Sequence, residues 1–447
     1  MSHPPTPLTR RAAALAPVAP AVAVLALPAL PVAPGGAEPA DVVSGLMVVY
    51  CVIRLLRERR RPLSPATAVV LGLPVVGLAL AAMGASSALT GLTGLGRYLQ
   101  IFVLVPAAVL LLIRDRADFR LLAWSFVGLA LWEGAVGVHQ YVTRTGASYQ
   151  GEDIRAVGTF GPQDVMGMAA AVSLGLVCAV GIALGRTSVR QRATAAGCAV
   201  ALLPPLAVSF SRGAWIATAV TCVVQLVLAG PRRALKVAAA GAAAGVILVG
   251  GFGVGTALLQ QRIDSIAQVT DAPDQSVVDR YTLWASATGM WREHPLTGVG
   301  LKGFPGYRDG HATLALSSGA EIAGAGASYR RQPLLSPHNM YLLVLSEQGL
   351  IGLLGLAGGW LALLVRGLRG LPRGRERAAG LDCALVGCGL LVWLLTDFVY
   401  ADIGGPSTVL TAMALGLVAW WALAGGKRAD VVPRETVRGR VEEAVAR

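Results

Sequence analysis

The chain has 447 residues, of which 55% are hydrophobic and only 14% are charged, and its mean hydropathy is +0.62. A soluble domain carries about 25% charged residues, so this composition excludes an ordinary soluble protein. In a soluble chain the net charge of +13 would point to nucleic acid. Here the basic residues lie in short segments between apolar runs, so no nucleic-acid partner is expected.

Apolar runs long enough to cross a bilayer as helices recur along the chain. They predict an all-α, polytopic membrane protein of about 12 transmembrane helices with one long extracytoplasmic loop that contains short helices. The expected spans are residues 12–33, 41–56, 66–84, 98–113, 119–142, 164–184, 193–209, 213–229, 235–256, 338–365, 381–400 and 405–424. The first run contains four prolines and follows Arg10 and Arg11, a pattern that also fits a cleaved signal peptide.

Positive charge sets the expected orientation. With the N-terminus inside, most of the 38 Lys and Arg residues fall in cytoplasmic segments. The expected organisation has four parts: spans one to nine in 1–256, an extracytoplasmic loop in 257–337, spans ten to twelve in 338–425, and a basic cytoplasmic tail in 426–447. The protein is therefore expected in the cytoplasmic (inner) membrane, with the lipid bilayer as a partner.

The sequence shows no sign of a metal site or a bound cofactor, and neither is expected. All six cysteines lie in apolar runs and are interpreted as small core residues: Cys51, Cys178, Cys198, Cys222, Cys383 and Cys388. Gly298, Gly300 and Gly303 match the spacing of a dinucleotide-binding loop. They lack the strand and helix that such a loop needs, so this interpretation is set aside.

Four polar stretches fall at the expected outer ends of spans. The first, Ser209 to Ala214, separates two apolar runs and contains Ser211 and Arg212. A charge at the membrane boundary is costly unless it has a role or a partner, so Arg212 is a candidate anion-binding residue, with Ser211 beside it. The alternative is an arginine that extends to the lipid headgroups.

The second stretch contains Arg280, Tyr281 and Trp284 in a predicted helix, which Ser276 and Asp279 begin as a capping box. A cation beside aromatic side chains fits a phosphate and a sugar ring. The alternative is a solvated face of a surface helix.

The third stretch is Ser336-Pro337-His338-Asn339. Serine followed by proline predicts a helix with Ser336 as its cap, Pro337 at the first position and His338 in the first turn. A histidine there can take a proton from a substrate, and Asn339 is included among the expected substrate-binding residues. The alternative is an interfacial histidine without a role.

The fourth stretch, Gly158 to Asp164 with Arg155 ahead of it, is weak by itself. Glu347 follows His338 by nine residues and is expected on the opposite side of the helix, as a buried hydrogen-bonding residue. Three ionisable residues lie inside apolar runs and leave a proton path, and hence a transporter, as an alternative: Glu133, His139 and Asp397.

Taken in order, these stretches resemble the O-antigen ligase and polymerase superfamily over roughly residues 95–400. The matching segments are RAVGTFGPQD, SFSRGAW, RYTLWASATGMWREHPLTGVGLKGF and SPHNMYLLVLSEQGLIGLLG. One departure concerns the fourth stretch, where the family usually has Pro-Asn and this chain has Pro162-Gln163-Asp164.

The resemblance implies a metal-independent membrane glycosyltransferase with its active site facing outside. Such an enzyme takes a glycan from an undecaprenyl diphosphate carrier and joins it to an acceptor hydroxyl during assembly of surface polysaccharide. The family's key arginines match Arg212 and Arg280, and its key histidine matches His338.

The acceptor stays open, because a glycan, a lipid or a protein would each fit. A ligase, a repeat-unit polysaccharide polymerase and a protein O-oligosaccharyltransferase share these stretches. Two alternatives come from other classes. A twelve-span transporter would be expected to show related halves, which the sequence lacks, and a purely structural membrane protein would not explain basic and histidine residues at one face.

Overall fold

The computed structural model describes residues 17–31, 39–58, 63–149, 153–233, 235, 275–316, 320–323, 330–332, 334–371 and 380–424. Within these ranges the chain is mostly helical, as the sequence predicts. The expected span at 235–256, apart from residue 235, lies outside the described residues, as does the tail at 426–447.

The first half of the chain forms a series of helices up to the long loop. They are α2 (Ala19–Ala26), η1 (Leu27–Ala29), α3 (Pro39–Glu58), α4 (Pro65–Met83), α5 (Ala88–Leu99), η2 (Gln100–Leu104), α6 (Val105–Leu112), α7 (Arg116–Thr143), η3 (Gly158–Gln163), α8 (Gly167–Leu184), α9 (Val189–Ala201), α10 (Leu203–Val208) and α11 (Arg212–Ala229). The second half contains α14 (Gln275–Glu293), α15 (Phe304–His311), α16 (Met340–Arg369), α17 (Leu381–Asp397) and α18 (Thr408–Leu423).

Seven helices of the described chain are long and apolar enough to cross a membrane. They are α3, α4, the continuous helix from α5 to α6, α7, α8, α11 and α16. The segment from α2 to η1 and the helix α18 are apolar but shorter. The protein is therefore a multi-pass membrane protein, and the expected total of about 12 spans stays a prediction.

Two spans differ from the expected boundaries. The helix expected at 98–113 begins at Ala88, ahead of a π-helical turn at Gln100–Leu104. The span expected at 193–209 is divided into α9 and α10 at Leu202. Pro204 and Pro205 follow this break, and proline has no N–H to continue the hydrogen bonding of the preceding helix.

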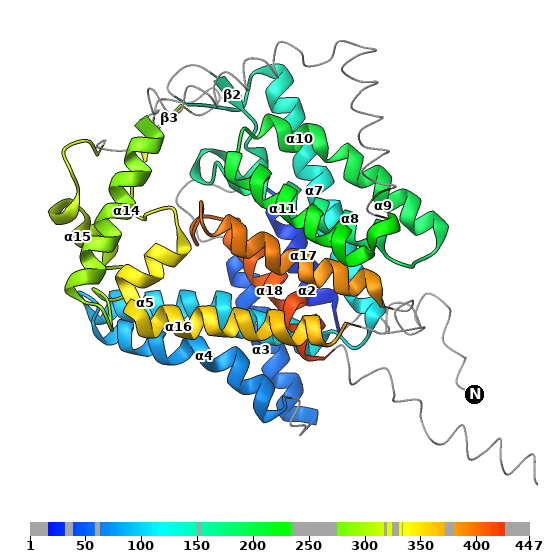
Figure 1. Ribbon diagram of the computed structural model, residues 1–447, viewed down its shortest axis with the longest axis horizontal. Helices are drawn as coiled ribbons and strands as arrows, with labels where there is room; N and C mark the ends of the chain where they lie inside the picture. Colours follow the sequence, from blue (N-terminus) through cyan, green and yellow to red (C-terminus); the bar gives the residue numbers. More distant parts are fainter. Residues whose placement is uncertain are drawn as a thin grey trace, which may run out of the picture.

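The centre of the molecule is formed by α8, α17 and α18. α17 packs against α8, α11 and α18, and in Figure 1 α17 and α18 lie between α16 with α4 on one side and α7, α8 and α11 on the other. In the most apolar stretch of α8, 83% of the residues are buried, whereas in the most apolar stretch of α3 only 22% are. α8 is thus a central helix, and α3 is peripheral.

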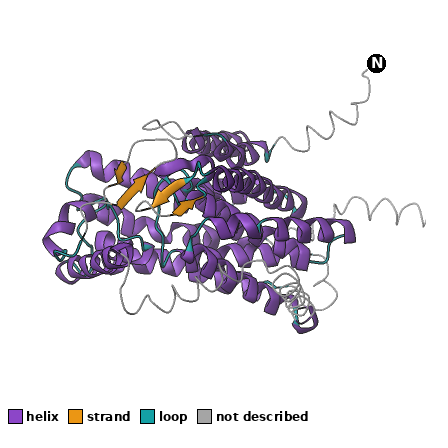
Figure 2. Cartoon of the chain, turned by 90° about the horizontal axis from the view of Figure 1, so that it is seen from above, coloured by secondary structure: helices purple, strands orange, loops and turns teal. Residues whose placement is uncertain are grey.

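A small four-stranded sheet lies in the loops, and the sequence did not predict it. Its antiparallel strands follow the order β2 (Asp153–Arg155), β1 (Ala147–Tyr149), β3 (Ala320–Ala323) and β4 (Arg330–Gln332). Figure 2 shows the strands together beside the helices. The sheet joins the segment after α7 to the loop after α15, so two distant parts of the chain lie side by side.

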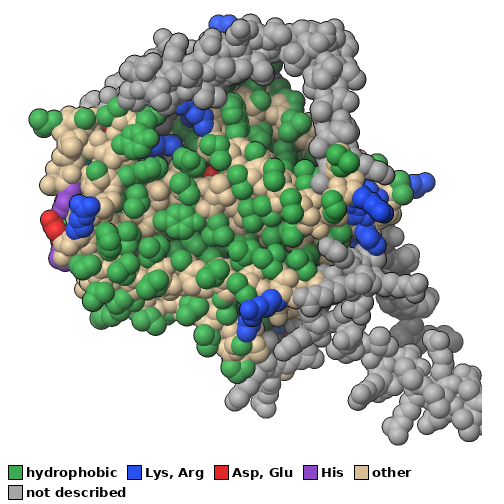
Figure 3. Space-filling model, viewed as in Figure 1, with side chains coloured by type: hydrophobic (Ala, Val, Ile, Leu, Met, Phe, Trp, Pro, Cys, Tyr) green, Lys and Arg blue, Asp and Glu red, His purple; other side chains and the backbone are tan. Residues whose placement is uncertain are grey.

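The surface agrees with a membrane environment. Figure 3 shows hydrophobic side chains across the middle of one face, with Lys and Arg toward its margins. Large apolar side chains such as Val76 on α4 and Val223 on α11 are about 60% exposed, at 62% and 59%. Such side chains are stable on a surface that faces lipid.

Candidate active site

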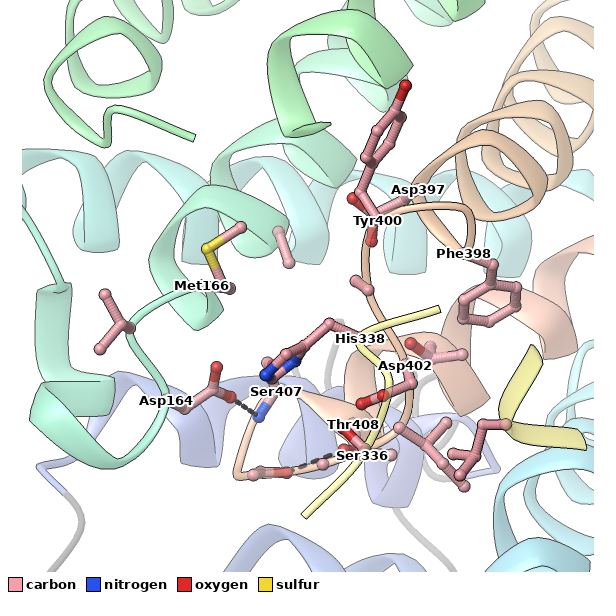
Figure 4. A pocket seen from close by; sticks show the side chains of 18 of the residues that line it. Asp164, Met166, Ser336, His338, Asp397, Phe398, Tyr400, Asp402, Ser407 and Thr408 are labelled. Atoms are coloured by element: carbon pink, nitrogen blue, oxygen red, sulfur yellow. Dashed lines mark hydrogen bonds between the residues drawn. The ribbon is translucent and has the colours of Figure 1, made fainter. Parts of the chain in front are cut away.

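A cavity of about 640 Å³ opens where the ends of several helices meet. Its wall comes from α5, the turn before α8, the N-terminus of α11, α14, the segment before α16 and the loop between α17 and α18. Figure 4 shows His338 in this cavity, with Asp164 on one side and Asp402 on the other. Ligand pockets commonly have about 300–1,000 Å³, so the cavity can hold a substrate of several rings.

His338 lines the cavity, but the local structure differs from the predicted one. α16 begins at Met340, and Asn339 is its N-cap, with its side-chain oxygen accepting a 3.0 Å hydrogen bond from the N–H of Leu342. The prediction that Ser336 caps the helix and Pro337 occupies its first position is therefore wrong. His338 lies before the helix, not in its first turn.

The reason is the backbone at His338. Its φ is 49°, in the left-handed region, which ends any helical path through this residue. The N–H of Met340 instead donates to the carbonyls of Phe398 and Ala401, at 2.8 and 3.0 Å. A non-glycine residue in this region costs about 1–2 kcal/mol, and such strain is concentrated at functional sites.

Arg280 lines the cavity from α14 and is half-buried. It lies close enough to Asp397, the last residue of α17, for the two charges to interact, and Asp397 also lines the cavity. α14 begins at Gln275, one residue before the predicted cap Ser276. The predicted helix is therefore confirmed, although its start is slightly earlier.

The structure does not place Tyr281 and Trp284 of this helix at the cavity, where they were predicted to bind substrate. Trp284 donates a 2.9 Å hydrogen bond from Nε1 to the carbonyl of Pro337, next to His338. Tyr281 is 64% exposed and packs edge-on against Trp284, and neither residue lines the cavity. Trp284 therefore holds α14 against the His338 segment.

The first polar stretch is only partly brought into the cavity. Ser211 lines it and caps α11, with Oγ accepting from the N–H of Ala214 at 3.4 Å. Arg212 is the first residue of α11, is exposed and does not line the cavity. Of the two predicted arginines, Arg280 alone lines the cavity.

Arg155 supplies a cation that the sequence analysis had noted without assigning a role. It lines the cavity, and its guanidinium donates to the carbonyl of Ser209, with Nη2 at 2.9 Å and Nε at 3.2 Å. Arg155, rather than Arg212, is therefore the arginine that lies in the cavity beside the turn at Ser209. In the sequence, its place just ahead of the fourth stretch was the only indication that it belongs to the site.

Asp164 gives this fourth stretch a structural role. It is 8% exposed, lines the cavity, and accepts a hydrogen bond from the N–H of Ser407 at the start of α18. Burial raises the pKa of this carboxyl, while hydrogen bonds from Ser407 and from the backbone of Gly167 and Met166 oppose the change. The turn therefore orients α18 relative to α8.

Glu347 is a buried hydrogen-bonding residue, as expected, but it also lines the cavity. It accepts from the N–H of Phe304 at 3.2 Å and from the hydroxyl of Tyr98 at 3.5 Å. The prediction that it points away from the His338 side placed both residues on one helix, but His338 lies before α16. Two residues after Glu347, α16 is broken at Gly349, where φ is 65° and ψ is −165°.

The glycine-rich loop before α15 supplies backbone hydrogen-bond partners to α16 at this break. The N–H groups of Val299 and Gly300 donate to the carbonyls of Ser346 and Glu347, at 2.8 and 3.0 Å. In return, Leu350 and Ile351 donate to Pro295 and Leu296, at 2.9 and 3.2 Å. The glycines that resembled a dinucleotide-binding loop therefore serve the close contact of two backbones.

The loop between α17 and α18 was missed by the sequence analysis, although it forms much of one wall. Residues 398, 400–405 and 407–408 all line the cavity, among them Tyr400 and Asp402. Its only sequence signal is the short polar segment YADIGGPS between two apolar runs. In the sequence, a segment of this kind cannot be distinguished from a simple connection between two helices.

The cavity wall carries equal numbers of basic and acidic residues among apolar ones. Four cationic residues, Arg97, Arg155, Arg280 and Lys302, and four acidic residues, Asp164, Glu347, Asp397 and Asp402, contribute to its wall. An anionic ligand would therefore be held by particular contacts rather than by a general positive potential. Within the described ranges, His, Cys, Asp and Glu side chains form no group of three that could hold a metal ion.

These features define a multi-pass membrane protein with a charged, substrate-sized cavity at the ends of its helices. Residues 197–357 match the model of the O-antigen ligase family, Wzy_C. The match extends from α9 past the break in α16 and includes Arg212, Arg280 and His338. It confirms the resemblance to the O-antigen ligase and polymerase superfamily. The search of curated proteins gave no match.

Proposed function

We propose that this protein is a membrane glycosyltransferase of the O-antigen ligase type. It moves a glycan from an undecaprenyl diphosphate carrier to an acceptor hydroxyl outside the cytoplasm. The observation that carries this proposal is the position of Arg280 and His338 in one cavity. Both residues come from the segment that matches the family, and they lie 58 positions apart in the chain.

The reaction breaks the bond between the anomeric carbon of the glycan and the diphosphate. Negative charge builds up on the leaving diphosphate, so catalysis needs cations near it. Arg280 provides a guanidinium, which matches phosphate oxygens in a bidentate geometry. Arg155 lines the same cavity and is proposed as the second cation there, while Arg212, at the start of α11, would act from outside the lining.

His338 is proposed to act on the acceptor. The acceptor oxygen forms a bond to the anomeric carbon, the carbon–diphosphate bond breaks, and the hydroxyl proton passes to the imidazole. Undecaprenyl diphosphate then leaves with the bonding electron pair. A general base of this kind contributes roughly 10²–10⁴-fold in rate. No step requires a metal ion or ATP, which fits a reaction outside the cytoplasm.

Asp397 is proposed as a positioning residue. It lies near Arg280 and lines the same cavity. A carboxylate beside a guanidinium fixes the direction of its donors, so Asp397 would aim Arg280 at the diphosphate. Trp284 would act in a similar way on the His338 segment through its hydrogen bond to Pro337.

Deletion of the gene tests the proposed function. The surface polysaccharide is separated on a gel, and lipid-linked intermediates are measured by mass spectrometry. Loss of the mature polysaccharide together with accumulation of undecaprenyl diphosphate-linked glycan on the outer face supports a transferase. Accumulation only on the inner face, or unchanged lipid-linked glycan, contradicts it. The missing product also identifies the acceptor and separates ligase, polymerase and protein glycosylation.

A further inference from the structure

The loop between α17 and α18 lines the cavity on both sides of His338. In Figure 4, Tyr400 extends to one side, beside Asp397, and Asp402 lies on the other, near Ser336 and Thr408. Two hydrogen bonds from the N–H of Met340 hold this loop against the start of α16, and Asp164 holds its far end through Ser407. The backbone of the loop is thus held in place next to the His338 segment.

Tyr400 belongs to the side of the cavity where Arg280 lies. Its N–H donates to the carbonyl of Asp397 at 2.8 Å, and Asp397 is the carboxylate near Arg280. Its ring packs on the N-terminal turn of α11, since a Cβ atom added at Gly213 would lie 3.3 Å from Cγ and 3.6 Å from Cδ2 of Tyr400. A held aromatic ring in a cavity offers a face with negative partial charge. The C–H bonds of a sugar ring, which are weakly positive, pack on such a face.

Asp402 belongs to the opposite side. It lies close enough to Tyr98 and Glu347 for their charges to interact. Glu347 already accepts hydrogen bonds from Tyr98 and from the backbone of Phe304. Among the residues that the structure describes, none donates a hydrogen bond to Oδ2 of Asp402, although this atom is buried.

A buried carboxylate oxygen without a donor is unfavourable. Asp402 also lines the cavity, where a hydroxyl group of a ligand can donate to its carboxylate. Sugars present several hydroxyl donors on a rigid ring. The chemistry at Asp402 therefore fits sugar hydroxyls, and the chemistry at Tyr400 fits the face of a sugar ring.

We propose that this loop forms two sugar-binding subsites, one on each side of His338. Tyr400 stacks on the sugar attached to the carrier diphosphate, because it lies on the Arg280 side. Asp402 binds hydroxyls of the acceptor glycan and so presents the reacting hydroxyl to His338. This inference rests on the proposed function and assigns its two substrates to opposite ends of one cavity.

Steady-state transfer by the full-length protein in proteoliposomes tests the assignment. The donor is undecaprenyl diphosphate-linked oligosaccharide extracted from host membranes, and the acceptor is glycan released from the host envelope. Tyr400→Leu should raise the KM for the donor about 3- to 10-fold, the range that a ring contact of this kind represents. Tyr400→Phe, which keeps the ring, should behave as the wild type. Asp402→Asn should raise the KM for the acceptor by about 10-fold.

Two control variants come from α15, outside the cavity lining. They are Tyr307→Leu and Asp309→Asn, which repeat the same chemical changes. Tyr307 is 45% exposed, and the side chain of Asp309 is 76% exposed. Both should leave each KM unchanged. Should Tyr400→Leu fail to fold, as judged by size-exclusion chromatography, Asp402→Asn still tests the two-subsite arrangement through its separate effects on donor and acceptor.

The outcomes separate this inference from the proposed function. If the Tyr400 and Asp402 variants have the same KM values as their control variants, the two subsites are contradicted. Transfer by the wild type still supports the proposed function in that case. Donor and acceptor effects that are exchanged between Tyr400 and Asp402 overturn the assignment of sides. Absence of wild-type transfer contradicts the function itself. Binding then still tests Tyr400, because Tyr400→Leu should weaken binding of the glycosylated carrier and leave binding of undecaprenyl diphosphate unchanged. Equal effects on both carriers overturn the stacking role.

Discussion

Asp164 accepts a 2.8 Å hydrogen bond on Oδ2 from the N–H of Ser407, a residue 243 positions later in the chain. The contact joins the turn before α8 to the start of α18, at the wall of the cavity. The φ of Gly405 is 73°, and a Cβ atom added at this glycine would lie 2.9 Å from the Asp164 side chain. The carboxylate is thus enclosed by the loop that it holds.

The enclosure of Asp164 predicts a pH dependence of stability. Burial raises the pKa of this carboxyl above its ordinary value of 3.8, so the folded protein holds the proton more tightly than the unfolded chain. Its contribution to stability is therefore complete below pH 3.8 and is lost as the pH rises through the pKa of the folded state. Asp164→Asn, which keeps an oxygen acceptor for Ser407, should remove this part of the pH dependence.

Thermal unfolding of the detergent-solubilised protein at a series of pH values above 3.8 checks the prediction. The wild type should lose melting temperature relative to Asp164→Asn as the pH rises. Asp309→Asn serves as the control. Asp309 is exposed, and its hydrogen bond to Arg308 lowers its pKa, so its effect has the opposite sign. Parallel curves for the wild type and Asp164→Asn contradict a pKa of Asp164 that burial raises in the folded protein.

Arg280 should be required for transfer because it faces the leaving diphosphate. Loss of a charge-assisted hydrogen bond costs about 1.5–3 kcal/mol, which is roughly 10- to 150-fold in rate. Arg280→Ala should therefore lower the transfer rate by this factor. Arg280→Lys should also lower it, because lysine lacks the bidentate geometry. Arg292→Ala is the control, since Arg292 lies on the same helix, is exposed and does not line the cavity.

Arg155→Ala and Arg212→Ala decide which second cation matters. Arg155 lines the cavity and Arg212 does not, so Arg155→Ala should impair transfer by a similar factor. The measurement is transfer by equal amounts of folded protein. Full activity of both Arg155→Ala and Arg280→Ala would rule out the binding of diphosphate by these arginines.

Two variants of His338 distinguish between its possible roles. As a general base it contributes roughly 10²–10⁴-fold, so His338→Ala should lower the transfer rate by about that factor. His338→Gln keeps a hydrogen-bond donor but cannot act as a base. Near-normal turnover of the glutamine variant would leave His338 as a phosphate ligand only.

The break in α16 predicts opposite effects for two glycines of one helix. Gly349 has a φ of 65°, and a Cβ there would lie 2.3 Å from the backbone of Leu296. Gly349→Ala should therefore destabilise the protein by at least about 1–2 kcal/mol, the cost of the left-handed conformation alone. Gly358 has nothing within 4 Å of an added Cβ, so Gly358→Ala should be neutral or stabilising by up to about 1 kcal/mol. Thermal unfolding of both variants checks the difference, and equal behaviour contradicts the pairing of the glycine-rich loop with α16.

The orientation in the membrane can be tested with single cysteines. The six native cysteines are replaced first, and Gly310→Cys on α15 and Arg369→Cys at the end of α16 are then compared. An impermeant thiol reagent should label position 310 in intact cells and position 369 only after permeabilisation, because the charge distribution places the loop outside. The reverse pattern would contradict the proposed extracytoplasmic reaction.

The sequence by itself determined the features that depend on local composition. Apolar runs of bilayer length predicted the helices α3, α4, α7, α8, α11 and α16 to within a few residues, because a helix satisfies its own backbone hydrogen bonds in lipid. The order of its polar stretches identified the resemblance and three predicted site residues that lie in the cavity wall, Ser211, Arg280 and His338. These inferences need only neighbouring residues.

Only the tertiary structure decided which distant residues share the cavity. Asn339, rather than Ser336, caps α16 because the loop at 398–401 takes the N–H of Met340. Glu347 lines the cavity together with His338, which lies before α16 and not in its first turn. α16 is broken at Gly349, where the backbone of another loop supplies the missing hydrogen bonds. Tyr400 and Asp402 follow the same rule. Their position depends on long-range backbone contacts, which hydrophobic periodicity and local capping patterns do not encode.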